Sequence, residues 1–148
     1  MCLLSPGVEI QRVTARGKAR TLDGMEVLVV EDDPLQRGAI VQALENMGHH
    51  VCWAETGEGA LELLRTEPVD VVLLDLDLGP GIDGWEVARR KLATPKVAHV
   101  PVIVVTGRPL GEVHEQAKNP LAGAMLVLGK PTDLVLLERA LDLVARGG

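Results

Sequence analysis

Apolar and polar residues alternate in blocks along the chain, and two periodicities follow one another. Short apolar runs rich in Val, Ile and Leu are typical of buried strands, and they predict strands over residues 26–30, 50–55, 69–74, 101–105 and 124–128. After four of the runs, apolar residues recur at helical spacing, which predicts helices over residues 34–47, 57–66, 84–93 and 134–146. The period is poor between residues 107 and 120, where Pro109 and Pro120 limit any helix to residues 110–118. The chain is therefore expected to repeat a strand–helix unit five times.

Residues that start and stop helices mark the ends of these elements. Asp33 precedes Pro34 and is expected to cap the first helix, which Gly48 ends. Asp83 and Glu86 resemble a capping box, and Asp133 can cap the last helix. The apolar stripes of the first and last helices are Leu35, Ala39, Ala43, Leu44 and Met47, and Leu134, Leu137, Leu141 and Val144.

Apolar strands separated by helices indicate a parallel sheet that is covered on both faces. Right-handed crossovers then give an α/β fold, a three-layer doubly wound sandwich around a five-stranded sheet. The pattern alone does not give the order of the strands.

Composition narrows the class of protein. The 148 residues suit one domain, and with two Trp, no Tyr and no Phe its core must be aliphatic. The net charge of −6 argues against a nucleic-acid partner. No apolar run is long enough to span a membrane, no secretory signal is recognisable, and Cys2 and Cys52 form no disulfide framework. A reduced, cytoplasmic protein is expected.

Residues 1–24 differ from the rest and are expected to form an N-terminal extension, a tail or linker, with the domain over residues 25–148. They carry four basic and two acidic residues, a net +2, which leaves −8 for the remainder. Met25 as the true start of the protein fits the same pattern. The alternative is a short element of residues 1–24 that packs on the domain or on a partner.

Candidate chemistry gathers where the predicted strands end. In a doubly wound sheet, ligands bind outside the carboxyl ends of the strands. The first predicted strand leads into Glu31 and Asp32, and the third leads into Asp75. The fourth leads into Thr106, and the fifth leads into Lys130. The second strand offers only Glu55 and Thr56. If that strand lies at the edge, the four inner strands carry all of the chemistry.

These groups together fit transfer of a phosphoryl group to a carboxylate. Glu31, Asp32 and Asp75 would repel one another, and a divalent cation with oxygen ligands, Mg²⁺, relieves that repulsion. Asp75 would be the nucleophile, while Thr106 and Lys130 would hold phosphoryl oxygens. Asp33 and Asp83 are better explained as helix caps.

The chain from about residue 25 to 145 resembles the receiver domain of bacterial two-component response regulators. The matching stretches are VLVVEDDP (27–34), VVLLDLDLGPGIDG (71–84), PVIVVTG (101–107) and LGKP (128–131). The resemblance implies a flavodoxin-like strand order 2-1-3-4-5, an order that flavodoxins and receivers share. It also implies a cis peptide bond between Lys130 and Pro131.

The resemblance assigns a role to each site residue. Asp75 is implied to be the phosphoacceptor, and Thr106 and Lys130 are implied to contact the phosphoryl group. For Mg²⁺, the implied ligands are the side chains of Asp32 and Asp75, Glu31 through a metal-bound water, and the backbone carbonyl of Asp77.

Two positions depart from the family's usual pattern. Receivers commonly carry Tyr or Phe three residues before the lysine, as a switch that reports phosphorylation, whereas this chain has Val127 there. The turn at residues 78–83 is about one residue longer than the commonest form. Trp85 lies too far along the chain to be taken as a substitute switch.

Two further residues are predicted to modulate the lifetime of the phosphoryl group. Asp77 follows Asp75 by two positions, and Arg108 follows Thr106 by two positions. Both would flank the path of an attacking water molecule. We expect them to tune hydrolysis, with a salt bridge across the site as one arrangement.

The leading hypothesis is a stand-alone receiver that takes its phosphoryl group from a sensor histidine kinase or a histidine phosphotransfer protein. It is not expected to be an enzyme beyond catalysing its own phosphorylation and dephosphorylation. Nothing follows Gly148 to form a DNA-binding output domain. We therefore expect signalling through an unknown downstream protein, or onward transfer of the phosphoryl group in a relay. Homodimerisation, and origin as the excised receiver of a hybrid kinase, stay open.

Two rival functions remain. An aspartate-nucleophile phosphatase would use Asp75 and Asp77 as its DxD motif, but those enzymes place the motif on their first strand and carry a cap domain. The other rival is a receiver-like module that binds partners without being phosphorylated.

Overall fold

Strands and helices alternate along the chain, as the sequence predicts. A computed structural model describes residues 24–118 and 126–147. Its elements are β1 (Glu26–Val30), α2 (Pro34–Asn46), β2 (His50–Ala54), α3 (Gly57–Thr66), β3 (Val71–Leu74), α4 (Gly84–Leu92), β4 (Val102–Thr106), α5 (Leu110–Ala117), β5 (Leu126–Gly129) and α6 (Leu134–Gly147).

The five strands form one parallel sheet in the order β2-β1-β3-β4-β5. Val29 pairs with Leu73, Leu73 with Ile103, and Val104 with Val127. This order is the one that the family resemblance implies. β2 lies at one edge, as expected, but β5 forms the opposite edge, so Lys130 follows an edge strand and the expectation of four inner strands was wrong.

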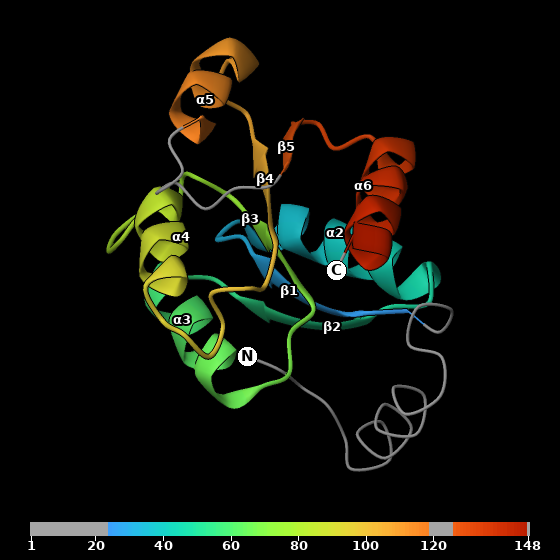
Figure 1. Cartoon of the computed structure of the whole chain (residues 1–148). Helices are drawn as coiled ribbons and strands as arrows, with labels where there is room; N and C mark the ends of the chain where they lie inside the picture. Colours follow the sequence, from blue (N-terminus) through green and yellow to red (C-terminus); the bar gives the residue numbers. More distant parts are fainter. Residues whose placement is uncertain (1–23, 119–125, 148) are drawn as a thin grey trace.

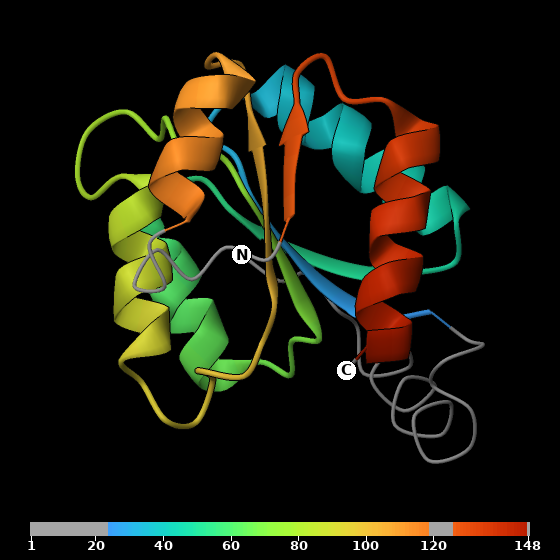
Figure 2. The ribbon, with the colours of Figure 1, turned by 45° about the horizontal axis from the view of Figure 1, so that its top comes forward.

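Helices cover both faces of the sheet (Figures 1 and 2). α3, α4 and α5 lie on one face, while α2 and α6 lie on the other. Because side chains alternate along a strand, neighbours such as Leu28 and Val29 belong to the two different cores. The predicted three-layer sandwich is therefore confirmed.

Local signals place the ends of two site-bearing helices. Asp33 accepts hydrogen bonds from the N–H groups of Leu35 and Gln36 (2.9 and 3.3 Å), so it caps α2 as predicted. Asp83 caps α4 by accepting from the N–H of Glu86 (2.9 Å). The capping box is only half formed, because the carboxylate of Glu86 pairs with Arg89 and Arg90 instead.

Some predicted boundaries were wrong. β3 begins at Val71 and not at residue 69; just before it, the side-chain carboxylate of Asp70 accepts the N–H of Glu26 (2.8 Å). β4 is shifted by one residue and includes Thr106. β5 ends at Gly129, and residues 124–125 of its prediction lie outside the described chain.

The two apolar stripes were correct only in part. Leu137, Leu141 and Val144 of α6 are buried, but Leu134 is 47% exposed. Leu35 of α2 is 85% exposed. Leu35 precedes the buried Leu44 by nine residues, which is two and a half turns, so the two side chains leave opposite sides of the helix.

A membrane-spanning segment was not expected. Among the described residues, none of the helices is both long enough and apolar enough to cross a membrane.

Candidate functional site

The predicted site residues lie together at the carboxyl ends of four parallel strands. Glu31 directly follows β1, Asp75 follows β3, and Lys130 follows β5. Thr106 is the last residue of β4 and is fully buried. The remaining strand, β2, is followed by Glu55 and Thr56, and Thr56 serves as the cap of α3.

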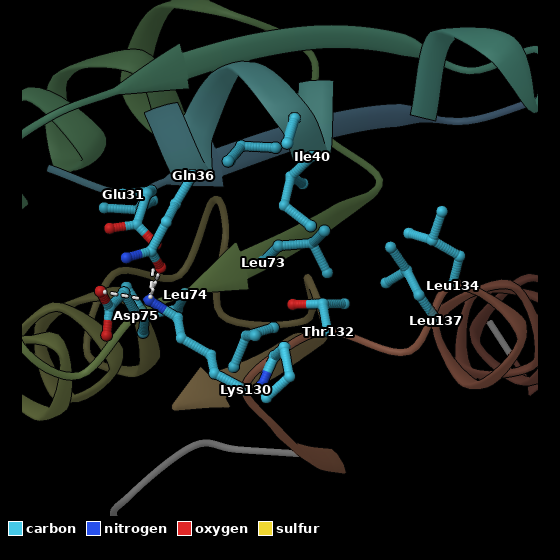
Figure 3. A pocket seen from close by; sticks show the side chains of 15 residues that line it. Glu31, Gln36, Ile40, Leu73, Leu74, Asp75, Lys130, Thr132, Leu134 and Leu137 are labelled. Atoms are coloured by element: carbon cyan, nitrogen blue, oxygen red, sulfur yellow. Dashed lines mark hydrogen bonds and ion pairs between the residues drawn. The ribbon is translucent and has the colours of Figure 1, made fainter. Parts of the chain in front are cut away.

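Lys130 forms hydrogen bonds to two carboxylates at these strand ends (Figure 3). Its Nζ atom donates to Oε1 of Glu31 (2.7 Å) and to Oδ2 of Asp75 (3.1 Å). The two carboxylates are nearly enclosed, with exposed side-chain fractions of 8% and 7%. Burial of paired charges on this scale requires good hydrogen bonding, which the ammonium supplies.

Burial and hydrogen bonding together shift the pKa values of Glu31 and Lys130 from their ordinary values. Burial is the main cause that raises the pKa of Glu31 above its ordinary value, although the bond from Lys130 opposes it. For Lys130, burial lowers the pKa, but the bonds to Glu31 and Asp75 outweigh that effect, so the pKa is raised. The ammonium therefore stays charged near neutral pH.

Three carboxylates meet at a point that suits a hard cation. Oxygen atoms of Glu31, Asp32 and Asp75 all lie within 4.8 Å of one another, and the carboxylate of Asp32 is exposed. Oxygen-only ligands with positions open to water are typical of Mg²⁺ sites. The chemistry of the donor set thus fits the predicted ion.

Backbone contacts hold Asp75 in place. Its N–H donates to the carbonyl of Val30 (3.1 Å), and its Oδ1 accepts from the N–H of Asp77 (3.0 Å). The first residue of α4, Gly84, packs directly against the backbone of Asp75. A Cβ atom on Gly84 would lie only 2.4 Å from the carbonyl oxygen of Asp75. Only glycine permits this close approach of the helix to the strand end.

Asp77 and Arg108 form the salt bridge that was put forward from the sequence. The guanidinium donates from Nη2 to Oδ1 of Asp77 (2.6 Å) and from Nε to both carboxylate oxygens (3.2 Å each). The hydrogen bond from Arg108 lowers the pKa of Asp77. The backbone N–H of Arg108 also donates to Oγ1 of Thr106 (3.0 Å), so the bridge is anchored at the end of β4.

Two predicted positions lie on β5 and just after it. The Lys130–Pro131 peptide bond is cis, as the resemblance implies. Val127 pairs with Val104 and packs, partly buried, against the core beneath α3, α4 and α5. The sequence contains no Tyr or Phe, so an aromatic switch of the usual kind is absent from position 127.

Sequence reasoning missed two residues of α2 that contact the site. Gln36 accepts a hydrogen bond from Nζ of Lys130 at its Oε1 atom (2.8 Å). Arg37 donates to the backbone carbonyl of Glu31 (3.1 Å), and its guanidinium lies 4.1 Å from the ring centre of Trp53. Their helical spacing gave no signal, since neither belongs to the apolar stripe.

An apolar pocket of about 560 Å³ opens beside Lys130, between α2 and α6. Its polar end comprises Glu31, Gln36, Asp75 and Lys130, and Figure 3 shows these side chains gathered to one side of it. The opposite end is lined by aliphatic side chains such as Ile40, Leu73, Leu134 and Leu137. The pocket explains why Leu134 is not fully buried.

Comparison with known proteins decides the family. The profile of the response regulator receiver domain matches residues 27–142. This chain belongs to that family. The receiver assignment made from four short motifs is therefore confirmed over most of the chain.

Two curated relatives differ in how much of their own length this chain matches. Protein PilH of Pseudomonas aeruginosa is 31% identical over 121 residues, which cover 82% of this chain and 98% of PilH. A gliding motility regulatory protein of Myxococcus xanthus is 36% identical over 121 residues, which cover 80% of this chain but only 15% of that protein. The chain thus spans nearly all of one relative and a small part of the other.

A solved structure resembles the fold and bears on the metal. The receiver domain of a sensor histidine kinase from Pseudomonas aeruginosa has a TM-score of 0.75 and 29% identity, covering 83% of this chain and 98% of that one. That structure contains a magnesium ion coordinated in its active-site cleft.

Proposed function

We propose that this receiver domain accepts a phosphoryl group on Asp75 from a phosphohistidine of a histidine kinase or phosphotransfer protein. The observation that carries the proposal is the contact of Lys130 with Asp75 beside the three-carboxylate cluster. A nucleophilic carboxylate, a fixed ammonium and a cation site are the parts that phosphoryl transfer requires.

We also propose that the receiver domain comprises residues 25–148 and that residues 1–24 form an extension to it.

Mg²⁺ would be held by the carboxylates of Glu31, Asp32 and Asp75, together with the backbone carbonyl of Asp77, Glu31 acting through a water molecule. When bound, the ion would neutralise charge that develops on the transferring phosphoryl group. Lys130 supplies a second positive charge from the end of β5, and the hydroxyl of Thr106 supplies a hydrogen-bond donor. These residues position the group and catalyse only the domain's own phosphorylation and dephosphorylation.

Signalling would proceed by protein–protein contact and not through nucleic acid. The receiver family is a signalling family, and a net charge of −6 disfavours a nucleic-acid surface. The downstream partner would recognise a surface changed by phosphorylation, and formation of a homodimer is one way to present it. We place this function in the cytoplasm, where histidine kinases deliver phosphoryl groups.

An aspartate-nucleophile phosphatase fits less well. Such an enzyme needs the second acid of its DxD motif protonated, to serve as a general acid. Asp77 is paired with Arg108, and this contact lowers its pKa and keeps it ionised. The geometry therefore favours a carboxylate that shapes the site and does not donate a proton.

Phosphorylation can be tested with a small donor. Phosphoramidate with Mg²⁺ should add ~80 Da to the intact mass, the signature of one phosphoryl group. Asp75→Asn should abolish the gain, and the matched variant Asp83→Asn, which changes a carboxylate at a helix cap, should retain it. Absence of the gain in the unaltered protein, or its persistence in Asp75→Asn, would refute the proposal and favour a module that binds partners unphosphorylated.

A further inference from the structure

The ammonium group of Lys130 has no hydrogen-bond donor to spare. An ammonium carries three N–H donors. Its Nζ atom has three acceptors, which are Oε1 of Glu31 (2.7 Å), Oε1 of Gln36 (2.8 Å) and Oδ2 of Asp75 (3.1 Å). A phosphoryl group that arrives on Asp75 must therefore displace one of these acceptors before Lys130 can bind it.

The three bonds differ in the free energy needed to release them. In the unphosphorylated site Glu31 and Asp75 are buried carboxylates, so their bonds to the ammonium join two opposite charges, whereas the bond to Gln36 joins a charge to a neutral group. Gln36 presents a neutral amide on the exposed first turn of α2. Its oxygen can turn to water, so the bond from Lys130 to Gln36 is the one released most easily.

We propose that Gln36 is a positioning residue that competes with the phosphoryl group for Lys130. Before phosphorylation, its amide oxygen occupies the place around Nζ that a phosphoryl oxygen takes afterwards. The inference rests on the proposed phosphorylation of Asp75. It goes beyond that function by naming a residue of α2 that sets how readily Lys130 becomes available.

The competition also connects the site to the surface of α2. Nε2 of Gln36 donates to Oδ2 of Asp33, the residue that caps this helix (3.2 Å). When Lys130 turns to the phosphoryl group, the amide of Gln36 loses one of its two side-chain partners at the start of α2. Phosphorylation therefore changes an exposed surface without any aromatic residue at position 127.

Substitutions that alter only the acceptor test the competition. Gln36→Met keeps the length of the side chain and removes the acceptor, whereas Gln36→Glu replaces a neutral acceptor with a charged one. Gln42→Met is the matched control, because Gln42 lies on the same helix and bonds only to Asn46 among the described side chains. The rate of mass gain is measured with phosphoramidate and Mg²⁺, since so small a donor needs no docking surface on α2.

In this reaction the P–N bond of phosphoramidate breaks and a P–O bond to Asp75 forms. The nitrogen leaves as ammonia with the proton that the donor carries. Gln36→Met should react about two- to tenfold faster than the unaltered protein, the range set by one hydrogen bond, and Gln36→Glu should react slower by a similar factor. Gln42→Met should match the unaltered protein.

A role of Gln36 in helix stability alone predicts a different result. Both substitutions would then slow the reaction, or neither would change it, and either result overturns the inference. If the unaltered protein gains no mass, the proposed function itself fails. As an independent readout, beryllofluoride with Mg²⁺ should shift the NMR signals of the Gln36 side-chain amide and leave those of Gln42 in place. Unshifted Gln36 signals in protein that binds beryllofluoride would also overturn it.

Discussion

Lys130 and Asp75 are 55 positions apart in the sequence, yet Nζ of the lysine lies 3.1 Å from Oδ2 of the aspartate. The ammonium thus lies beside the carboxylates that are proposed to bind Mg²⁺. Two cations that share the same carboxylates repel each other, so Lys130 should weaken the affinity for the metal. The same residue would promote phosphoryl transfer once the group is present.

Lys130→Met should therefore bind Mg²⁺ more tightly. We expect the dissociation constant to fall by about tenfold, which corresponds to ~1.4 kcal/mol. Calorimetric titration with MgCl₂ measures it, and Lys118→Met, which removes an exposed lysine paired with Glu115, is the control. An unchanged or larger dissociation constant in Lys130→Met would show that the ammonium does not compete with the ion.

The bridge between Asp77 and Arg108 should lengthen the life of the phosphoryl group. It lies beside the site, and we expect it to obstruct the approach of water to Asp75. Asp77→Asn and Arg108→Ala should each shorten the half-life of the acyl phosphate. The factor should be about fivefold or less, because an exposed ion pair contributes up to ~1 kcal/mol.

A double-mutant cycle separates the bridge from effects of either residue alone. If the bridge acts as a unit, Asp77→Asn combined with Arg108→Ala should shorten the half-life no more than one substitution does. Loss of phosphate from isolated phosphoprotein gives the rate. Independent, multiplicative effects in the double variant would contradict a role for the bridge.

Gly84 should be essential for the packing behind Asp75. An added Cβ atom would meet the carbonyl oxygen of Asp75 at 2.4 Å and Cα of Leu76 at 2.7 Å, and neither backbone atom can rotate away. Gly84→Ala should lower the free energy of unfolding by about 1–3 kcal/mol, as overpacking does. Gly111→Ala, on α5 with nothing within 4 Å, should instead stabilise by about 0.5–1 kcal/mol. Urea denaturation measures both, and equal effects would refute this account.

The sequence was most informative where it encoded the sheet and its carboxyl ends. Parallel strands must end at the same edge, so Glu31, Asp75 and Lys130 could be brought together from the sequence alone. Asp33 and Asp83 were predicted as caps because a short acid before a helix has a specific backbone partner. These predictions depend on local rules or on topology.

Contacts that depend on the rotation of a helix could not be read in the same way. Leu35 was placed in the apolar stripe because it precedes Ala39 by four residues, yet it leaves α2 on the side away from the sheet. Gln36 was missed because its contact depends on how far Lys130 reaches from another strand end. Both outcomes follow from packing of α2 against the sheet, which periodicity alone does not determine.

Lys91 is a buried lysine that no sequence rule indicated, and it should contribute to stability. It is 2% exposed on α4, and its Nζ donates to the carbonyls of Val97 (3.1 Å) and Ala98 (3.0 Å). Lys91→Met keeps the apolar stem but leaves both carbonyls without this donor. The free energy of unfolding should fall by about 1–3 kcal/mol, the range for unsatisfied buried groups.

Lys96→Met provides the control for Lys91. Lys96 is exposed and donates to one carbonyl, that of Arg65 (2.9 Å), where water can replace the ammonium. Its loss should change stability by less than about 0.5 kcal/mol. Chemical denaturation of the two variants compares them directly, and equal losses would show that burial of Lys91 is not the cause.

His49 should make the stability of the domain depend on pH on the acidic side of neutrality. Burial is the main cause that lowers its pKa below the ordinary 6.5; the charge of His50 adds to the effect, while Asp142 and Glu138 oppose it. Its Nδ1 accepts the N–H of Met25 (3.0 Å), which requires that nitrogen to be unprotonated.

The sign of this dependence follows from the lowered pKa. The stability that neutral His49 contributes is fully present above pH 6.5 and is lost as the pH falls through the lowered value of the folded protein. His49→Gln can still accept the bond at its amide oxygen but cannot titrate. Between about pH 7 and pH 5 the unaltered protein should lose on the order of 1 kcal/mol more than this variant, one hydrogen bond's worth. Urea denaturation across that range, with the exposed His114→Gln as control, measures it, and parallel curves for His49→Gln and the unaltered protein would contradict the assignment.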